Sequence, residues 1–254
     1  MKKLLYGRRG EPYEIAGTTL RFVPGTRPIK QKYRTSPNSV ARYDALQIEF
    51  MADALKSGDT ALDVGAHVGQ CTLVMAARCG PAGHVVAFEP DPKSRQLLLR
   101  NIALNPSVSA IRVEELALYD REGSAVLFSR GGDANSSLSK SAFPGSPAGV
   151  LQEVQVTVTT LDSYLDRTGE PVPKVVKIDA EGAEIRILGG AEKLLAGDSL
   201  VLCELHPYAW PGFDVSLQNL KTCAARADRR IRYLDQAGDL RGEAVYGTVL
   251  LEKR

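Results

Sequence analysis

Several acidic residues follow an apolar stretch in the second half of the sequence. Within KVVKIDAEGAEIRIL (residues 174–188), the first five residues predict a short buried strand, and Asp179, Glu181 and Glu184 come directly after it. A buried carboxylate without a partner costs free energy. These acids therefore either face water at the start of a helix, where the helix dipole favours them, or surround a ligand that favours negative charge. We interpret Glu184 as an acid of the helix start and leave both roles open for Glu181.

Two further acids accompany a glycine-containing turn in ALDVGAHVGQ (residues 61–70). Asp63 precedes Gly65 and Gly69, and the flanking apolar residues predict a strand followed by a helix. Glycines in such a turn allow a tight bend and the close approach of a ligand to the backbone. Glu89 ends the next predicted strand, about 20 positions later, where an acid can accept hydrogen bonds from ribose hydroxyls. A glycine turn without any ligand is the alternative interpretation.

Asp63 bears on which nucleotide this turn would bind. A carboxylate two residues before the first glycine would repel the pyrophosphate of a dinucleotide, whereas S-adenosylmethionine carries an ammonium and a sulfonium group that favour nearby carboxylates. In addition, His67 occupies the place of the middle glycine of the dinucleotide-binding motif. The sequence therefore favours S-adenosylmethionine over a nicotinamide cofactor.

The elements predicted around these residues alternate between strands and helices. A hairpin is predicted at 13–25 and a helix at about 46–55; further strands at 60–66, 83–90, 110–120, 174–178 and 199–205; further helices at 70–80, 91–105, 183–195 and 216–226; an antiparallel strand pair at 123–128 and 153–165; and a closing hairpin from residue 230. Strands that alternate with helices pair in parallel through right-handed crossovers. The expected fold class is α/β: a Rossmann-like, doubly wound, mostly parallel sheet with a C-terminal antiparallel hairpin.

We expect residues 1–45 to form an N-terminal hairpin and arm, and residues 46–254 to form the cofactor-binding domain. Residues 129–150 are rich in glycine, serine, alanine and proline, which is typical of a functional lid or of a disordered segment. Short polar side chains in this insertion, Asn135, Ser136 and Ser137, are candidates for contacts with a polyol substrate; simple solvation of the loop is the alternative.

Six motifs resemble, in chain order, those of the FkbM family of S-adenosylmethionine-dependent methyltransferases: LDVGAHVGQCTL, VVAFEPDP, ELALYD, TLDSYL, VVKIDAEGAEIRILGGA and LCELHP. They run from about residue 62 to residue 207, and KIDAEGAE followed by LGGA is the most specific. The resemblance implies the class I methyltransferase architecture and O-methylation, commonly of sugar or polyketide hydroxyls. One departure is His67, where the family commonly has Asn in GANVG, and this departure puts contacts to the methionine carboxylate in question.

The same resemblance implies the residues that would bind the cofactor. The methionine end would be held by Asp63 and by the backbone of Gly65, Ala66, His67, Val68 and Gly69. Glu89, followed by Pro90, would hold the ribose, and Ala117 and Leu118 would lie against the adenine.

Catalysis would take place where the strand before Asp179 ends at the same sheet edge as the glycine turn. Glu204 and His206 alternate along the last parallel strand and so share one face. Since a neutral alcohol is a poor nucleophile, a positioned base should accelerate the transfer by about 10²–10⁴-fold. His206 is the first candidate for this base, Asp179 is the second, and Glu204 and Glu181 complete the cluster. No metal is predicted, although these four residues together could bind Mg²⁺.

The composition argues against several broad classes of protein. The chain has 254 residues, of which 44% are hydrophobic and 24% charged, and its net charge of +2 gives no argument for nucleic-acid binding. No segment approaches the roughly 20 apolar residues that span a bilayer. The 4 cysteines lack the spacing of metal ligands or of a redox pair. We expect a cytoplasmic protein whose partner is a small molecule, not a nucleic acid or a membrane.

Together, these patterns predict an S-adenosylmethionine-dependent O-methyltransferase that acts on a hydroxylated small molecule, with a sugar or glycoside as the favoured acceptor. Three alternatives stay open at this point: an N-methyltransferase of a small amine, a module that binds S-adenosylmethionine without catalysis, and a nicotinamide-dependent oxidoreductase, against which Asp63 argues.

Overall fold

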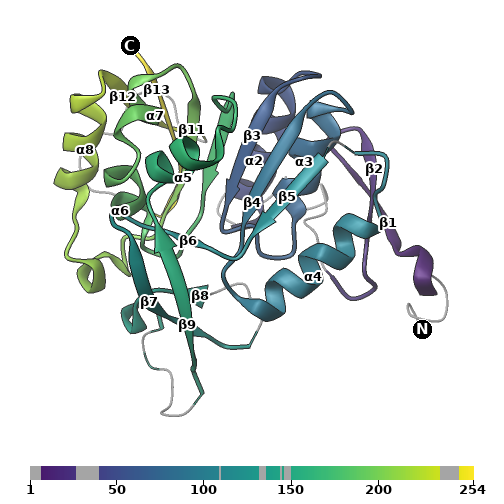
Figure 1. The fold of residues 1–254 in the computed structure, drawn as a ribbon, viewed down its shortest axis with the longest axis horizontal. Coiled ribbons are helices and arrows are strands. Elements are labelled where there is room, and N and C mark those ends of the chain that lie inside the picture. The colour runs from purple at the N-terminus through teal and green to yellow at the C-terminus, as the bar shows by residue number, and fades with distance from the viewer. Residues whose placement is uncertain are drawn as a thin grey trace.

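The structure is a computed structural model and describes residues 7–26, 40–108, 110–131, 136–143, 145, 150–234 and 246–254 (Figure 1). The helices are α2 (Val40–Ala54), α3 (Gln70–Cys79), α4 (Pro92–Ala103), α5 (Leu161–Thr168), α6 (Glu184–Gly189), α7 (Glu192–Ala196) and α8 (Leu217–Arg226), with short 3₁₀ helices at Gly7–Arg9, Lys140–Ala142 and Trp210–Phe213. In this part of the chain, none of the helices has both the length and the apolar character needed to cross a membrane.

A seven-stranded sheet with the order β12-β13-β11-β10-β3-β4-β5 forms the centre of the fold. Its strands are β3 (Thr60–Val64), β4 (His84–Phe88), β5 (Ala110–Glu114), β10 (Val175–Ile178), β11 (Leu200–Leu205), β12 (Arg229–Tyr233) and β13 (Gly247–Lys253). The five strands from β5 to β11 pair in parallel, and β13 pairs antiparallel with both β11 and β12. The predicted doubly wound, mostly parallel sheet with C-terminal antiparallel strands is therefore confirmed.

Both faces of this sheet are covered: its strands are nearly continuous apolar runs, whose successive side chains point to opposite faces. Leu62 and Val64 of β3 join a core with α5, α6, α7 and α8, whereas Ala61 joins a second core with α2 and α3. The N-terminal hairpin of β1 (Glu11–Ile15) and β2 (Thr18–Phe22) packs into the second core through Ile15, Leu20 and Phe22. The N-terminal region thus shares its core with the rest of the chain.

A second sheet with the order β6-β9-β7-β8 projects from the main body and lies at the bottom of Figure 1. Its strands are β6 (Ala117–Leu118), β7 (Gly123–Ser129), β8 (Ser136–Ser137) and β9 (Gln152–Thr159). The antiparallel β7–β9 pair was predicted. The chain returns from this sheet to the central one through α5 and the start of β10.

Four predicted elements have the wrong extent. The helix expected at about 46–55 begins at Val40. The strand expected at 110–120 ends at Glu114, and residues 117–118 pair instead with β9. The strand expected at 153–165 ends at residue 159, because the Thr160 side chain caps α5 by accepting a hydrogen bond from the Ser163 backbone N–H at 3.0 Å. The helix expected at 183–195 is two helices, separated at Gly190, where an added Cβ would lie 2.4 Å from a backbone oxygen.

Candidate active site

The loop after β3 packs directly against the end of β10. Gly65 has a φ of +77°, and a Cβ atom placed on it would lie 1.8 Å from the backbone oxygen of Asp179. Gly69 has a φ of +87°, and its Cβ would lie 2.4 Å from the Leu98 side chain of α4. L-residues with side chains rarely adopt such φ values, and there is no room for a side chain at either position. Glycine is therefore required where the loop, β10 and α4 meet.

His67 lies between these glycines and also has a positive φ, +48°. Non-glycine residues seldom adopt this left-handed conformation, but asparagine, aspartate and histidine are several-fold enriched in it. The backbone therefore explains how histidine can replace a glycine or an asparagine here. The His67 backbone N–H donates a 2.6 Å hydrogen bond to Glu89, which ties the loop to the end of β4.

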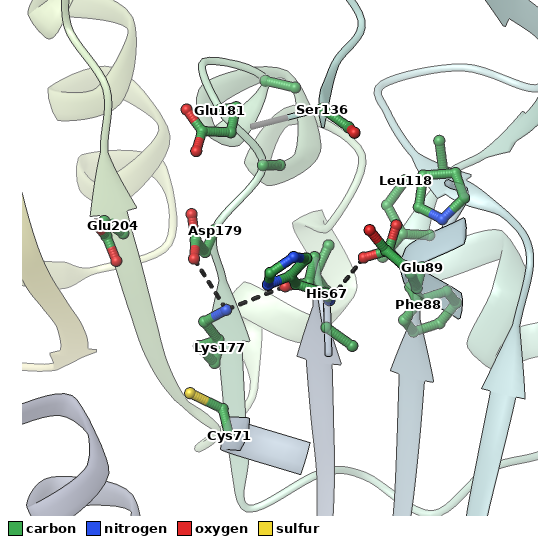
Figure 2. A pocket seen from close by; sticks show the side chains of 18 of the residues that line it. His67, Cys71, Phe88, Glu89, Leu118, Ser136, Lys177, Asp179, Glu181 and Glu204 are labelled. Atoms are coloured by element: carbon green, nitrogen blue, oxygen red, sulfur yellow. Dashed lines mark hydrogen bonds and ion pairs between the residues drawn. The ribbon is translucent and has the colours of Figure 1, made fainter. Parts of the chain in front are cut away.

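Glu89 is 5% exposed and is held by backbone donors on both oxygens. His67 N–H donates to Oε2, and Asp91 N–H donates to Oε1 at 2.8 Å. Burial raises the pKa of Glu89 to about 7, although the two backbone hydrogen bonds oppose the rise. Figure 2 shows its carboxylate beside Phe88 and Leu118, at the apolar end of the pocket.

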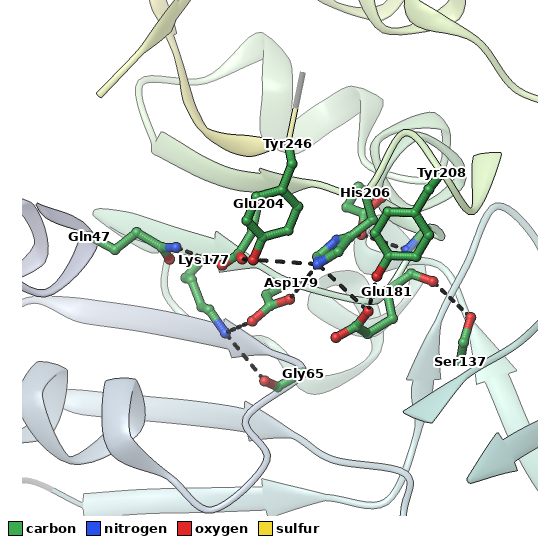
Figure 3. A network of polar contacts seen from close by, with 12 residues as sticks. Gln47, Gly65, Ser137, Lys177, Asp179, Glu181, Glu204, His206, Tyr208 and Tyr246 are labelled. Carbon is green, nitrogen blue, oxygen red and sulfur yellow. Dashed lines mark hydrogen bonds and ion pairs between the residues drawn. The ribbon is translucent and has the colours of Figure 1, made fainter. Parts of the chain in front are cut away.

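Lys177 of β10 lies beneath the pocket with its ammonium between two carboxylates. Nζ is 3.5 Å from Oδ1 of Asp63. It also lies 3.1 Å from Oδ2 of Asp179 and donates to the Gly65 backbone oxygen at 3.3 Å (Figure 3). Burial opposes the charge of Lys177, but Asp179 and Asp63 outweigh it and raise the pKa well above the usual value. The other oxygen of Asp63, Oδ2, accepts a 2.5 Å hydrogen bond from Thr72.

His206 follows β11 and is 2% exposed. Its Nδ1 lies 2.8 Å from Oε1 of Glu184, and its Nε2 points toward Asp179, Glu181 and Glu204, whose nearest oxygens are 3.8, 3.7 and 4.0 Å away (Figure 3). Glu184 is the first residue of α6, as predicted, but it is fully buried rather than facing water. The acids after β10 thus surround an imidazole.

The two outer carboxylates are each held by a tyrosine. Glu181 has a φ of +47° and accepts a 2.8 Å hydrogen bond from the Tyr208 hydroxyl through Oε2. Glu204 accepts hydrogen bonds from the Tyr246 hydroxyl and, at 2.7 Å, from Nε2 of Gln47 in α2. Both tyrosine rings also meet the His206 ring edge to face, with centroids 5.7 and 5.4 Å apart.

These charges shift one another's pKa values. Burial alone would lower the pKa of His206, but Glu184, Asp179 and Glu181 raise it to about 10. Burial raises the pKa of Glu181 to about 7, and burial together with Asp179 raises the pKa of Glu204. The pKa of Asp179 is lowered, because Lys177 and His206 outweigh its burial. His206 thus differs from the near-neutral base expected from the sequence.

A cavity of about 870 Å³ joins the loop, Glu89 and the acid cluster at the carboxyl ends of the central strands. The predicted site residues on its wall are Gly65, Ala66, His67, Val68, Glu89, Pro90, Ala117, Leu118, Ser136, Asp179, Glu181, Glu204 and His206. Asp63 and Gly69 do not line it, and the Ser137 hydroxyl donates instead to the Glu181 backbone oxygen at 2.8 Å. Asn135 lies outside the described residues.

Among the residues of this wall that sequence reasoning missed are the four side chains that hold its carboxylates: Gln47, Lys177, Tyr208 and Tyr246. A single signal was available for one of them, since Lys177 interrupts an apolar strand immediately before Asp179. The other three come from segments distant in sequence from their carboxylate partners, and no local pattern marks them.

Comparison of the sequence with models of known protein families identifies one family. The family model described as the methyltransferase FkbM domain matches residues 63–239, which is more than half of the chain. The chain belongs to the FkbM methyltransferase family. The resemblance inferred from the six motifs is thereby confirmed, and the protein is a methyltransferase.

Individual relatives of this FkbM methyltransferase are more distant. The hexuronic acid methyltransferase AglP of Haloferax volcanii is 29% identical over 195 residues, which cover 76% of this chain and 73% of AglP. A crystal structure of methyltransferase FkbM from Methylobacillus flagellatus KT has a TM-score of 0.48 and 15% identity; the match covers 84% of this chain and only 52% of that one. An O-methyltransferase from Bacillus cereus, solved in complex with SAH, has a TM-score of 0.45 and 16% identity, with 85% and 82% covered.

Proposed function

We propose that the protein transfers a methyl group from S-adenosylmethionine to a hydroxyl group of a sugar. The observation that carries the proposal is the two-ended cavity. One end has the glycine loop, Glu89 and apolar side chains, and the other has a cluster of carboxylates around His206. The similarity to AglP, which is named for a hexuronic acid, supports a carbohydrate as acceptor.

The residues present at the first end fit S-adenosylmethionine. The Glu89 carboxylate is fixed by two backbone N–H groups and still has lone pairs that can accept hydrogen bonds from ribose hydroxyls. Phe88, Leu116 and Leu118 provide apolar surface for an adenine. Gly65 has no side chain, and it lines the cavity, where its backbone can contact the methionine end of the cofactor. A volume of about 870 Å³ is near the upper end of the usual range for small-molecule sites.

The chemistry at the second end follows from its charges. Bound S-adenosylmethionine supplies a methyl group on a cationic sulfonium, and Asp179, Glu181 and Glu204 favour a positive charge beside them. Asp179 is the proposed acceptor of the hydroxyl proton, at Oδ1. Lys177 holds the other oxygen, Oδ2, so that the carboxylate stays ionised and Oδ1 faces the cavity. Orientation of the acceptor by this wall can supply about 7–11 kcal/mol of the barrier reduction.

Tyr208 gives a specific reason to favour a sugar over a smaller alcohol. The residue is 47% exposed and lines the cavity, and its hydroxyl donates a hydrogen bond to Glu181. An aromatic face combined with hydrogen-bonding carboxylates suits a pyranose, which has both an apolar C–H face and several hydroxyls. This rim would hold the acceptor while the buried cluster handles its proton.

Calorimetric titration with S-adenosylhomocysteine tests the cofactor half of the proposal. We expect wild-type protein to bind it and not NAD, Glu89→Gln to weaken binding by at least tenfold, and Glu115→Gln to leave binding unchanged. Glu115 is a matched control, because its side chain is 75% exposed and pairs with Arg95 on the surface, outside the cavity. Folded wild-type protein that does not bind S-adenosylhomocysteine would refute this half.

The acceptor half is tested by S-adenosylhomocysteine formation with hexuronic acids, neutral glycosides and amino sugars. We expect turnover with a hydroxylated sugar and its loss in Asp179→Asn. Turnover that requires an amine would indicate N-methylation instead. Cofactor binding without turnover on any acceptor would indicate a binding module.

A further inference from the structure

One buried ring nitrogen in the acid cluster faces carboxylate oxygens that lie too far away to form hydrogen bonds with it. The Nε2 atom of His206 has no hydrogen bond to any residue that the structure describes, although the side chain is 3% exposed. Asp179 and Glu181 each direct an oxygen at it, but from 3.8 and 3.7 Å, which is beyond hydrogen-bonding distance. A buried ring nitrogen thus points into an acid-lined space.

Glu184 fixes the orientation of this ring. It is fully buried, and its Oε1 lies 2.8 Å from Nδ1 of His206 and accepts a 2.8 Å hydrogen bond from the Gly182 backbone N–H. Trp210 Nε1 lies 3.4 Å from its other oxygen. The carboxylates around His206 favour protonation of the ring and raise its pKa to about 10, so an ion that binds Nε2 must displace the proton there. In the neutral imidazole, a carboxylate that accepts from one ring nitrogen leaves the other as a lone-pair donor, and metal-binding histidines almost always have such a partner.

The two carboxylates are also arranged around the same point. Lys177 and Tyr208 hold Asp179 Oδ2 and Glu181 Oε2, respectively. Glu181 reaches the cluster from a left-handed backbone conformation, φ +47°, which costs free energy for a residue with a side chain and is typical of functional sites. One ligand atom from each of Asp179, Glu181 and His206 can be chosen so that all three lie within 4.8 Å of one another.

We propose that Asp179, Glu181 and His206 bind a divalent metal ion of the Mn²⁺ or Mg²⁺ type through one atom each. Ligands about 2.0–2.2 Å from such an ion lie roughly 3–4 Å apart, so the observed separations need little adjustment. Two of the three ligands are carboxylate oxygens, which suit Mg²⁺ and Mn²⁺.

Three protein ligands leave coordination positions open toward the cavity. Each carboxylate oxygen has two lone pairs, so Oδ1 of Asp179 can contact the ion with one and still accept the hydroxyl proton with the other. Resting on the proposed function, two adjacent oxygens of a sugar would occupy these positions, and the ion would orient the acceptor at an otherwise acidic wall. Such an ion would also allow a negatively charged sugar to approach carboxylates that would repel it alone. Binding of the ion by the protein does not depend on this use.

The test is Mn²⁺ binding by chelator-treated protein, followed by the electron paramagnetic resonance signal of the free ion, without cofactor or acceptor. We expect one Mn²⁺ per chain, displaced by excess Mg²⁺, and at least tenfold weaker binding in Glu181→Gln and in His206→Asn. His84→Asn is the matched control, because His84 also lies near a carboxylate, 3.3 Å from Glu170, but outside the cavity. We expect this variant to bind Mn²⁺ with the same affinity as wild type.

Trp210, the only tryptophan of the chain, supplies a second measurement that needs no variant. Paramagnetic Mn²⁺ at the proposed site should quench its fluorescence with the same midpoint as binding. Folded wild-type protein that binds no Mn²⁺ at millimolar concentration would overturn the proposal. Binding without quenching, or binding that both cluster variants leave unchanged, would overturn it too. Any of these results would leave S-adenosylhomocysteine binding, and with it the proposed function, untouched.

Discussion

Lys177→Met removes the ammonium that lies between Asp63 and Asp179 under the cavity and keeps most of the side-chain volume. In its absence, Oδ1 of Asp63 has no charged partner among the residues that the structure describes, and Asp63 is 0% exposed. Removing one member of a buried ion pair costs about 3–5 kcal/mol, because the remaining charge stays desolvated. Asp179 contributes less to this loss, because its side chain keeps 28% exposure toward the cavity. We therefore expect a loss of about 3–5 kcal/mol, carried chiefly by Asp63.

Urea unfolding followed by circular dichroism measures this loss as the difference in unfolding free energy from wild type. Lys174→Met is the control, since Lys174 directly precedes β10 but its side chain is exposed. Surface substitutions of this kind usually stay within about 0.5 kcal/mol. A difference between the two variants of less than about 1 kcal/mol would refute the reasoning, because it would mean that Asp63 does not depend on the ammonium.

Three further predictions concern the cavity. Wild-type affinity for S-adenosylhomocysteine should rise about tenfold from pH 6 to pH 8, because a Glu89 carboxyl with a pKa of about 7 goes from mostly neutral to mostly ionised; calorimetry at both pH values checks this. Gly65→Ala should abolish that binding and lower the melting temperature, since the added Cβ would lie 1.8 Å from a backbone oxygen. Tyr208→Phe should lower kcat/KM for the acceptor by roughly 10- to 100-fold, because it removes a hydrogen bond to a carboxylate worth about 1.5–3 kcal/mol.

Each of these has an internal control. Glu89→Gln should bind weakly with little change between pH 6 and pH 8, and an undiminished pH dependence in it would assign the titration to another group. Gly17→Ala shares a positive φ, +74°, but has no atom within 4 Å of the added Cβ, so that it should cost only the backbone strain. Tyr208→Phe should leave S-adenosylhomocysteine affinity as in wild type; equal losses of cofactor and acceptor binding would contradict a role confined to the acceptor.

The parts of the fold that the sequence predicted correctly are those governed by local pattern. Apolar runs followed by an acid marked β4 and β10, and an apolar run followed by glycines marked β3. Because parallel strands end at one edge of a sheet, the sequence also predicted that Asp179 and Glu89 lie at the same edge, where both line the cavity. The glycine loop was also predicted from a local pattern, namely two glycines between a predicted strand and a predicted helix. Errors arose where tertiary pairing decided the outcome: nothing in residues 110–120 shows that the chain leaves the central sheet after residue 114 to pair with β9.

Glu184 shows why chemistry at the site was harder to predict than its position. An acid in the first turn of a helix usually faces water, and the sequence favoured this interpretation. The burial of Glu184 depends on Gly182, Trp210 and His206, which are brought together only by the packing of α6 against the end of β11. The same packing changes the pKa of His206, which a sequence pattern cannot reveal.

Glu204 has a further consequence for protein engineering. It lies inside the segment 63–239 that defines the family, but its two hydrogen-bond partners, Gln47 and Tyr246, lie on either side of that segment. A chimera that grafts residues 63–239 into another family member would carry this carboxylate without Gln47 and Tyr246, and the flanking segments of the other protein would surround it. Exchange of acceptor preference between family members should therefore require α2 and the approach to β13 to travel with the graft.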